Sequence, residues 1–222
     1  RKMNTCEIAG WENYDFIDFS FEKIFMTDYN AEGIKEKMLI ETHLERKFPK
    51  SPFVPENKEE RDSNSEDVIT IQALGLKKRM AHVGCKYVVI GLSGGLDSTL
   101  AVLVACRTMD MLEISRENVI AVTMPCFGTT GRTHNNAVKL AKELGITLRE
   151  INIKESVLTH LRDIGHDEND HNITFENAQA RERTQVLMDL ANEYGGLVIG
   201  TGDMSELALG FATYNGDHMS MY

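Results

Sequence analysis

The sequence predicts an α/β protein whose core is an open parallel sheet flanked by helices on both faces. The first observation behind this prediction is that short β-branched runs alternate with longer helical patterns from about residue 66 to residue 201. Such strands pair in parallel, because each helix carries the chain back across the sheet by a right-handed crossover. The second observation is that glycine-rich turns follow two of the expected strands, at 93–95 and 200–202. These turns lie at the carboxyl ends of their strands. Ligands of an open parallel sheet bind beyond the carboxyl ends, so the sequence predicts one binding crevice at that edge.

The expected elements follow from the periodicity of apolar residues. In chain order they are a helix at 66–82, a strand at 86–92, a helix at 98–113, a strand at 118–124, a helix at 132–144, a strand at 147–153, a helix at 173–194 and a strand at 196–199. The first strand, Tyr87-Val88-Val89-Ile90-Gly91-Leu92, is a short apolar run of the kind that forms a buried strand. Because parallel strands share one carboxyl edge, we expect Ser93, Pro125 and Thr201 to lie around the same crevice.

The first sixty residues lack this alternation. They hold an aromatic-rich run at 14–25, a possible amphipathic helix at 31–48 and a charged, proline-containing stretch at 50–62. Few residues of that stretch could be buried, so it is typical of a linker. We therefore expect residues 1–60 to be a partial segment of a second domain and residues 61–222 to form the α/β domain. The chain stops at residue 222 without a terminating signal, and we expect it to be part of a longer protein.

Composition narrows the class of protein. The 222 residues are 42% hydrophobic and carry a formal net charge of −10. That charge disfavours an extended grip on nucleic acid, which relies on lysine and arginine to neutralise phosphates. No apolar run approaches the ~20 residues that span a bilayer, and no signal-type apolar core follows residue 1. The four cysteines are far apart with no C-x-x-C pair, which predicts reduced thiols and a cytoplasmic protein.

The turn Ser93-Gly94-Gly95-Leu96-Asp97-Ser98-Thr99 joins the first strand to a helix. Unpaired backbone N–H groups and the helix dipole at such a turn form an anion site, and a phosphate group would fit there. Asp97 decides the interpretation, because a carboxylate in a phosphate site repels its ligand unless a divalent cation lies between them. The turn therefore predicts a nucleotide together with Mg²⁺.

This turn differs from two common nucleotide motifs. It has no lysine, so it is not the G-x-x-x-x-G-K-[ST] loop, and its glycines lack the spacing of G-x-G-x-x-G. The alternative is an ordinary strand-to-helix turn in which Ser93 caps the helix and Asp97 stabilises its first turn. Capping needs only one short polar residue, which leaves the combination of serines, paired glycines and aspartate unexplained.

The second turn is Gly200-Thr201-Gly202-Asp203-Met204-Ser205-Glu206. Thr201 could donate to a phosphate or ribose, and Glu206 could complete the coordination of a hard cation that Asp97 begins. The alternative is a simple helix start, with Asp203 or Thr201 as the N-cap and Glu206 completing a capping box. Both interpretations stay open for this turn when it is considered alone.

The first turn resembles the pyrophosphate-binding loop of the ATP pyrophosphatases, which split ATP into AMP and pyrophosphate to activate a carbonyl or carboxyl group. Members include synthetases for NAD, GMP, asparagine and argininosuccinate, and tRNA-thiolating enzymes. The resemblance implies a Rossmann-like sheet of the adenine nucleotide alpha hydrolase type. It leaves the acceptor of the activated group open.

The second turn narrows the resemblance. Residues 200–210, together with Asn177-Ala178-Gln179-Ala180-Arg181, resemble the signatures of NAD synthetases. Both fit best the glutamine-dependent branch, in which a nitrilase-type amidotransferase domain precedes the synthetase. Two further segments, 51–55 and 71–76, are similar to that branch's junction between domains.

The resemblance implies a role for each matching residue. Residues that would bind ATP are Ser93, Gly94, Gly95, Leu96, Asp97, Ser98, Thr99 and Thr201. Residues that would bind deamido-NAD are Asn177, Arg181, Glu206, Phe211, Ala212, Thr213 and Tyr214. Asp97 and Glu206 would also hold Mg²⁺.

The resemblance implies amidation of deamido-NAD to NAD through an adenylated intermediate, with release of AMP and pyrophosphate and with ammonia from glutamine. The chemistry requires no catalytic nucleophile from the protein. It also implies a homo-oligomer that binds neither membrane nor nucleic acid. The alternatives are another ATP pyrophosphatase-type enzyme, either GMP synthetase-like or tRNA-thiolating, and a non-catalytic nucleotide-binding module.

Two features depart from the family's pattern. Cys126, in the segment 124–132 that corresponds to a second ATP-side loop, stands where glycine is expected. The Glu, Lys and Cys of the amidotransferase cannot be located, and Cys6 has no nucleophile context around it.

Overall fold

The computed structural model describes residues 51–127 and 131–222, with side chains for all of these except residues 131–134. Two compact units divide the chain, Arg1–Phe53 and Val54–Tyr222. The described helices and strands all belong to the second unit. The elements expected at 14–25 and 31–48 lie outside the described residues. The domain boundary near residue 60 stays a prediction.

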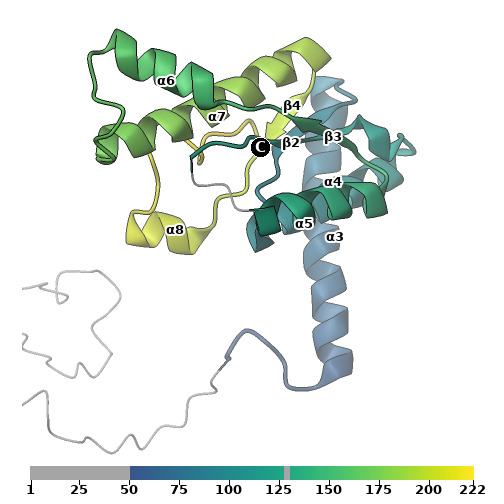
Figure 1. Cartoon of the computed structure of the whole chain (residues 1–222). Coiled ribbons are helices and arrows are strands. Elements are labelled where there is room, and N and C mark those ends of the chain that lie inside the picture. Colours follow the sequence, from purple (N-terminus) through teal and green to yellow (C-terminus); the bar gives the residue numbers. More distant parts are fainter. Residues whose placement is uncertain (1–50, 128–130) are drawn as a thin grey trace, which may run out of the picture. The chain divides into compact units, whose positions relative to one another are not determined.

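The sheet of the second unit has four parallel strands in the order β3-β2-β1-β4 (Figure 1). They are β1 (Val88–Gly91), β2 (Val119–Thr123), β3 (Thr147–Glu150) and β4 (Leu197–Ile199). The chain adds β2 and β3 on one side of β1 and then crosses to place β4 on the other. The order therefore reverses between β1 and β4, and such a switch point is where ligands of open α/β sheets bind.

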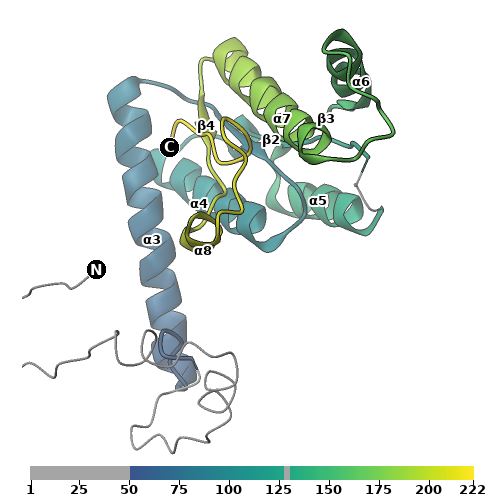
Figure 2. The same cartoon turned by 90° about the vertical axis from the view of Figure 1, so that its left-hand side faces the viewer.

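Helices cover both faces of this sheet, as the alternation predicted (Figures 1 and 2). On one face lie α3 (Lys58–Val83), α4 (Leu96–Leu112) and α5 (Gly131–Leu144), and on the other lie α6 (Lys154–Asp163) and α7 (Ile173–Tyr194). A 3₁₀ turn, η2 (Arg116–Asn118), precedes β2, and a short helix, α8 (Met204–Leu209), follows β4.

Alternate residues of a strand pack into the core clusters on opposite faces of the sheet. In β1, Val88 and Ile90 pack in one core cluster with α4 and α5, whereas Val89 packs in another with α7. All three are fully buried. A strand buried on both faces reads as a continuous apolar run, which is why 87–92 was recognisable in the sequence.

Three elements differ from the expected ones. The helix expected at 66–82 begins at Lys58, inside the stretch predicted to be a linker. Asn57 caps it by accepting a hydrogen bond from Glu59 N, and its first turns are exposed, so their polar composition is compatible with helix. The helix α6 was not among the expected elements, and α8 was expected only as the alternative interpretation of the turn at 200–206.

The last residues of the chain run along β4. Met221 and Tyr222 donate backbone hydrogen bonds to Val198 O at 3.0 and 3.2 Å, and Gly200 N donates to Tyr222 O at 2.8 Å. The Tyr222 hydroxyl lies against Gly75 of α3, where a Cβ would require the tyrosine side chain to shift. The end of the chain therefore covers the outer edge of the sheet beside β4.

Among the described cysteines, Cys85 and Cys106 are buried and Cys126 is partly buried. Burial raises the pKa of each of these thiols. Cys6 lies outside the described residues. Within 51–127 and 131–222 we find no helix long and apolar enough to cross a membrane.

Candidate functional site

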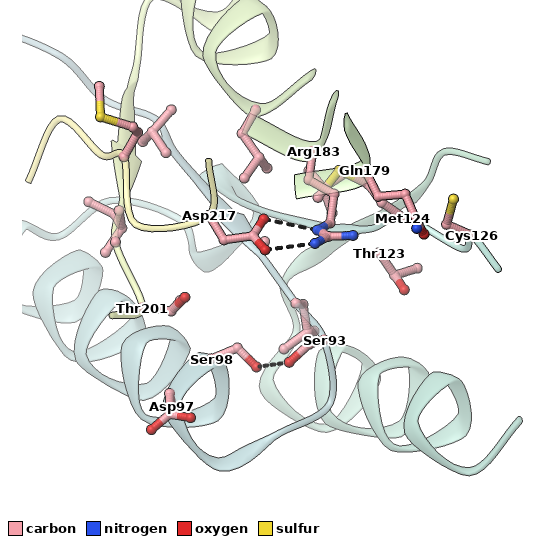
Figure 3. Close-up of a pocket in the computed structure, with 18 of the residues that line it drawn as sticks. Ser93, Asp97, Ser98, Thr123, Met124, Cys126, Gln179, Arg183, Thr201 and Asp217 are labelled. Carbon is pink, nitrogen blue, oxygen red and sulfur yellow. Dashed lines mark hydrogen bonds and ion pairs between the residues drawn. The ribbon is translucent and has the colours of Figure 1, made fainter. Parts of the chain in front are cut away.

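A pocket of about 570 Å³ lies at the carboxyl edge of the sheet (Figure 3). The ends of β1, β2 and β4, the turns after them, one face of α7 and residues 217 and 219 of the chain's last segment line it. Thr123, at the end of β2, is buried on its wall. The expected convergence of loops at this edge is therefore confirmed for the turns that follow β1, β2 and β4.

The turn after β1 presents three residues to this pocket, Ser93, Asp97 and Ser98. The Ser93 and Ser98 hydroxyls lie 3.1 Å apart, and Gly95 N donates to Ser93 Oγ at 3.2 Å. Gly94 has φ of +82°, a conformation that L side chains rarely adopt. The paired glycines and serines thus shape this turn.

The N-cap residue of α4 is Gly95, which offers no side-chain cap. In the alternative interpretation, the cap by Ser93 is therefore wrong, whereas Asp97 does stand in the first turn of the helix. The first N–H groups of α4 have no capping side chain, and an uncapped helix start beside a pocket is suited to an anion. Leu96 and Thr99 belong to the same turn but do not line the pocket, and Thr99 Oγ1 donates to Gly95 O at 2.7 Å.

The turn after β4 contributes Thr201 and Glu206 to the same pocket. The capping box expected as the alternative is present: Glu206 N donates to Asp203 Oδ1 at 2.8 Å, and Asp203 N donates to Glu206 Oε2 at 3.1 Å. The two interpretations are therefore not exclusive, because Glu206 caps α8 through one oxygen while its side chain lines the pocket.

The residues expected to bind deamido-NAD contact one another across two segments. Thr213 Oγ1 donates to Asn177 Oδ1 at 2.9 Å, and Arg181 Nε donates to the Tyr214 carbonyl at 3.1 Å. Phe211 and Tyr214 are largely exposed. Of the expected set, Glu206 lines the pocket, whereas Asn177, Arg181 and residues 211–214 are absent from its lining. The sequence separation of more than thirty residues between the partners is closed by the fold alone.

Sequence reasoning missed the part of α7 that faces the pocket. Glu176, Gln179, Arg183 and Leu187 all line it. Their spacing of three or four residues places them on one helix face, so the signal was available in the sequence. It was hidden because Arg183 sits in the mixed charge run 181–183, which is typical of a solvated face.

Arg183 is paired with Asp217, from the segment that follows α8 (Figure 3). Its Nε and Nη2 donate to the two carboxylate oxygens at 2.9 and 2.7 Å. Burial has the largest single effect and lowers the pKa of Arg183, but the hydrogen bond to Asp217 and the negative charge of Asp217, with smaller contributions from Cys126 and Glu176, together raise it above its ordinary value.

The charged residues of the pocket lining are four carboxylates and one guanidinium: Asp97, Glu176, Glu206, Asp217 and Arg183. A polyphosphate would enter this pocket against a net negative charge, which a divalent cation would offset. Among the described side chains, no group of three or more histidine, cysteine, aspartate or glutamate residues could hold a metal by itself. Two carboxylates at one pocket still fit Mg²⁺, which keeps water and phosphate oxygens in its coordination shell.

Comparison with known proteins agrees with this geometry. The family model described as NAD synthase matches residues 68–221. This chain belongs to the NAD synthase family. Membership in the family favours the resemblance to NAD synthetases over the GMP synthetase-like and tRNA-thiolating alternatives.

Two relatives illustrate the similarity in sequence. The glutamine-dependent NAD(+) synthetase of Mycobacterium leprae is 44% identical over 184 residues, which cover 81% of this chain and 27% of that protein. The enzyme of the same description from Thermotoga maritima is 38% identical over 154 residues, covering 68% and 26%. The chain therefore spans about a quarter of the length of these relatives.

Solved structures show the same fold. A glutamine-dependent NAD+ synthetase from Acinetobacter baumannii, in complex with adenosine diphosphate, superposes with a TM-score of 0.63 at 31% identity over 70% of this chain and 29% of that one. An NH3-dependent NAD synthetase from Campylobacter jejuni gives 0.62 at 28% identity, covering 70% and 64%. The Rossmann-like parallel sheet with helices on both faces is thereby confirmed.

Proposed function

We propose that this protein catalyses the ATP-dependent amidation of deamido-NAD to NAD. The observation that carries the proposal is that the turns after β1 and β4 open on one pocket at the switch point of an NAD synthase-family sheet. In the proposed reaction the pyridine carboxylate of deamido-NAD attacks the α-phosphorus of ATP and expels pyrophosphate. Ammonia then attacks the adenylated carbonyl, forms the amide, releases AMP and gives up a proton.

The turn Ser93–Thr99 receives the pyrophosphate group in this proposal. Its support is the uncapped start of α4, where backbone N–H groups are available, and the Ser93 and Ser98 hydroxyls at the pocket. Donors already in place for the charge of the leaving group lower the barrier without reorganisation. Thr201, on the neighbouring turn, contacts ATP from the β4 side. No protein nucleophile takes part, and much of the rate comes from holding two nucleotides in reacting position.

Asp97 and Glu206 hold Mg²⁺ in the proposal. Both carboxylates line the same pocket, and Glu206 uses only Oε2 for the capping box. When bound, Mg²⁺ offsets the phosphate charge as a Lewis acid. The excess of carboxylates over guanidinium groups in the lining is the physical reason why ATP would need it here.

Asn177, Arg181 and residues 211–214 bind deamido-NAD in the proposal. Their support is the pair of hydrogen bonds that joins α7 to Thr213 and Tyr214 beside the pocket. The exposed rings of Phe211 and Tyr214 offer apolar surface on which a nucleotide base could stack.

Glutamine is the proposed source of ammonia, because the relatives that match most of this chain are named glutamine-dependent. Residues 1–60 would then be the tail of the amidotransferase domain. A cytoplasmic location and a homo-oligomeric assembly complete the proposal.

One assay tests the function directly. The intact protein is incubated with ATP, Mg²⁺, ammonium and deamido-NAD, and AMP, pyrophosphate and NAD are expected in equal amounts. Cleavage of ATP at the same rate without deamido-NAD would identify another acceptor. Nucleotide binding without any cleavage would identify a binding module instead.

A further inference from the structure

The segment that follows α8, residues 210–219, is held against α7 at three points. We call it the return segment. Two of the points are the hydrogen bonds that Thr213 donates to Asn177 and that Arg181 donates to the Tyr214 carbonyl, and the third is the pair of Arg183 with Asp217. The three residues of α7 lie within two turns of one helix, so their positions relative to one another are fixed by the helix backbone.

The Arg183–Asp217 pair differs from the other two contacts in strength and place. Two parallel bonds between a guanidinium and a carboxylate fix both distance and orientation, which a single hydrogen bond does not. The side chains are 31% and 53% exposed, respectively, and both residues line the pocket. The residues of the other two contacts, Asn177 with Thr213 and Arg181 with Tyr214, do not line the pocket. Of the three contacts, the Arg183–Asp217 pair is therefore the one that holds the return segment at the pocket wall.

The return segment is internally a tight turn. Gly216 N donates to Thr213 O at 2.8 Å, Met219 N donates to Gly216 O at 2.9 Å, and Asn215 has φ of +55°. A Cβ at Gly216 would lie 2.8 Å from the Thr213 Cβ, so only glycine fits there. Such a turn keeps its shape by itself, but its position over the pocket depends on what it is attached to. Support from α8 is weak, since that helix has no buried residue.

We propose that Arg183 is a positioning residue, which acts through Asp217 to hold the return segment where it forms the deamido-NAD side of the site. The identity of the ligand in this inference rests on the proposed function. The positioning role of Arg183 rests only on the contacts between α7 and the return segment. Arg183 touches no reacting atom in it. Its contribution is to make the wall of the site before the ligand arrives, which lowers the ordering cost of binding.

The first test needs no activity. Amide hydrogen exchange is measured on the ligand-free protein carrying Arg183→Lys, which keeps the charge but loses the two parallel bonds. We expect amides 213–219 to exchange about tenfold faster while those of β1 and α4 do not change. The matched control is Arg116→Lys, because Arg116 makes the same two-bond pair with Asp110 at 2.8 and 2.5 Å away from the pocket. Unchanged exchange at 213–219 would overturn the proposal, whether or not the protein makes NAD.

The second test uses steady-state kinetics. We expect Arg183→Lys to raise the KM for deamido-NAD about tenfold and to leave the KM for ATP within about twofold. The double variant Arg183→Gln/Asp217→Asn should be no worse than the more severe single variant, because the two residues act as one unit. Effects that multiply in the double variant, or an equal rise in both KM values, would contradict a positioning role through Asp217. A protein that turns over no deamido-NAD at all would overturn the proposed function, and the exchange result would still decide the role of Arg183.

Discussion

The turns that follow β1 and β4 lie at the same edge of the sheet, but the helices that begin there satisfy their first N–H groups in different ways. The start of α4 is a glycine with no capping side chain, whereas α8 begins with a complete capping box between Asp203 and Glu206. A helix start without a cap leaves donors for a ligand, and a capped one uses them internally. The first turn therefore presents backbone N–H donors, and the second presents side chains.

The two turns also differ in how they are supported. Helix α4 packs Val102, Ala105, Cys106 and Met109 into the core, so the turn after β1 is fixed by a long buried helix. Helix α8 is six residues long and has no buried residue. The turn after β4 is held instead by its own capping box, by the hydrogen bond from Gly200 N to Tyr222 O, and by α7 through the return segment. The following predictions test this contrast, beginning with the largest expected effect.

Asp97→Asn should reduce turnover on the order of 10² or more, because the turn would lose the charge that fixes Mg²⁺ beside the phosphates. Pyrophosphate release under saturating ATP, ammonium and deamido-NAD measures it. The control is Asp110→Asn on the same helix, for which less than a twofold change is expected. An Asp97→Asn enzyme at near wild-type rate would remove Asp97 from the metal site.

Glu206→Gln should also reduce turnover on the order of 10². Glutamine can still accept the hydrogen bond from Asp203 N, so the capping box stays and only the charge is lost. Thermal denaturation should therefore give an unchanged midpoint. A loss of activity with equal loss of stability would indicate a structural role for Glu206, and full activity in both this variant and Asp97→Asn would exclude the shared cation.

Gly94→Ala should destabilise the protein by about 1 to 2 kcal/mol, because Gly94 has φ of +82°. It should also raise the KM for ATP, since the strain falls on the proposed phosphate turn. Urea unfolding and initial rates measure the two effects. Gly84→Ala is the control: Gly84, at φ of +77°, ends α3, so we expect a similar loss of stability with no change in the KM for ATP.

Asp203→Ala should weaken the start of α8 by about 1 kcal/mol, the usual cost of losing an N-cap. Because α8 buries nothing, global unfolding would miss this change, and amide exchange at residues 204–206 is the measurement to use. Asp203→Asn should have little effect, since asparagine caps equally well. If both variants exchange at the wild-type rate, the capping box does not support the second turn.

The fold was largely predictable from local pattern. The buried strands, the helices between them and the position of both turns at strand ends follow from apolar periodicity and glycine placement, and the structure confirms them. The start of α3 was not predictable, because its first turns are exposed and charged and therefore resemble a linker. The helix α6 is short and begins where the strand expected at 147–153 was to end, so its pattern at 154–163 did not stand out.

The candidate site was predictable in part. Ser93, Asp97, Ser98, Thr201 and Glu206 were expected together and do line one pocket, while their roles toward ATP and Mg²⁺ remain predictions. Arg183 and Asp217 were missed, because a charged residue on a helix and another in a polar turn carry no local sign that they will pair. Their 34-residue separation is closed only when α7 and the return segment pack together.

The sequence by itself determined the alternation of strands and helices, the serine- and glycine-rich turn at 93–99 and the resemblance to the family, because each depends on residues close together in the chain. Only the tertiary structure decided that β4 lies beside β1, that Glu206 both caps α8 and lines the pocket, and that Arg183 joins Asp217. These features depend on where distant segments meet, and that is set by the packing of the whole core rather than by any local stretch of sequence.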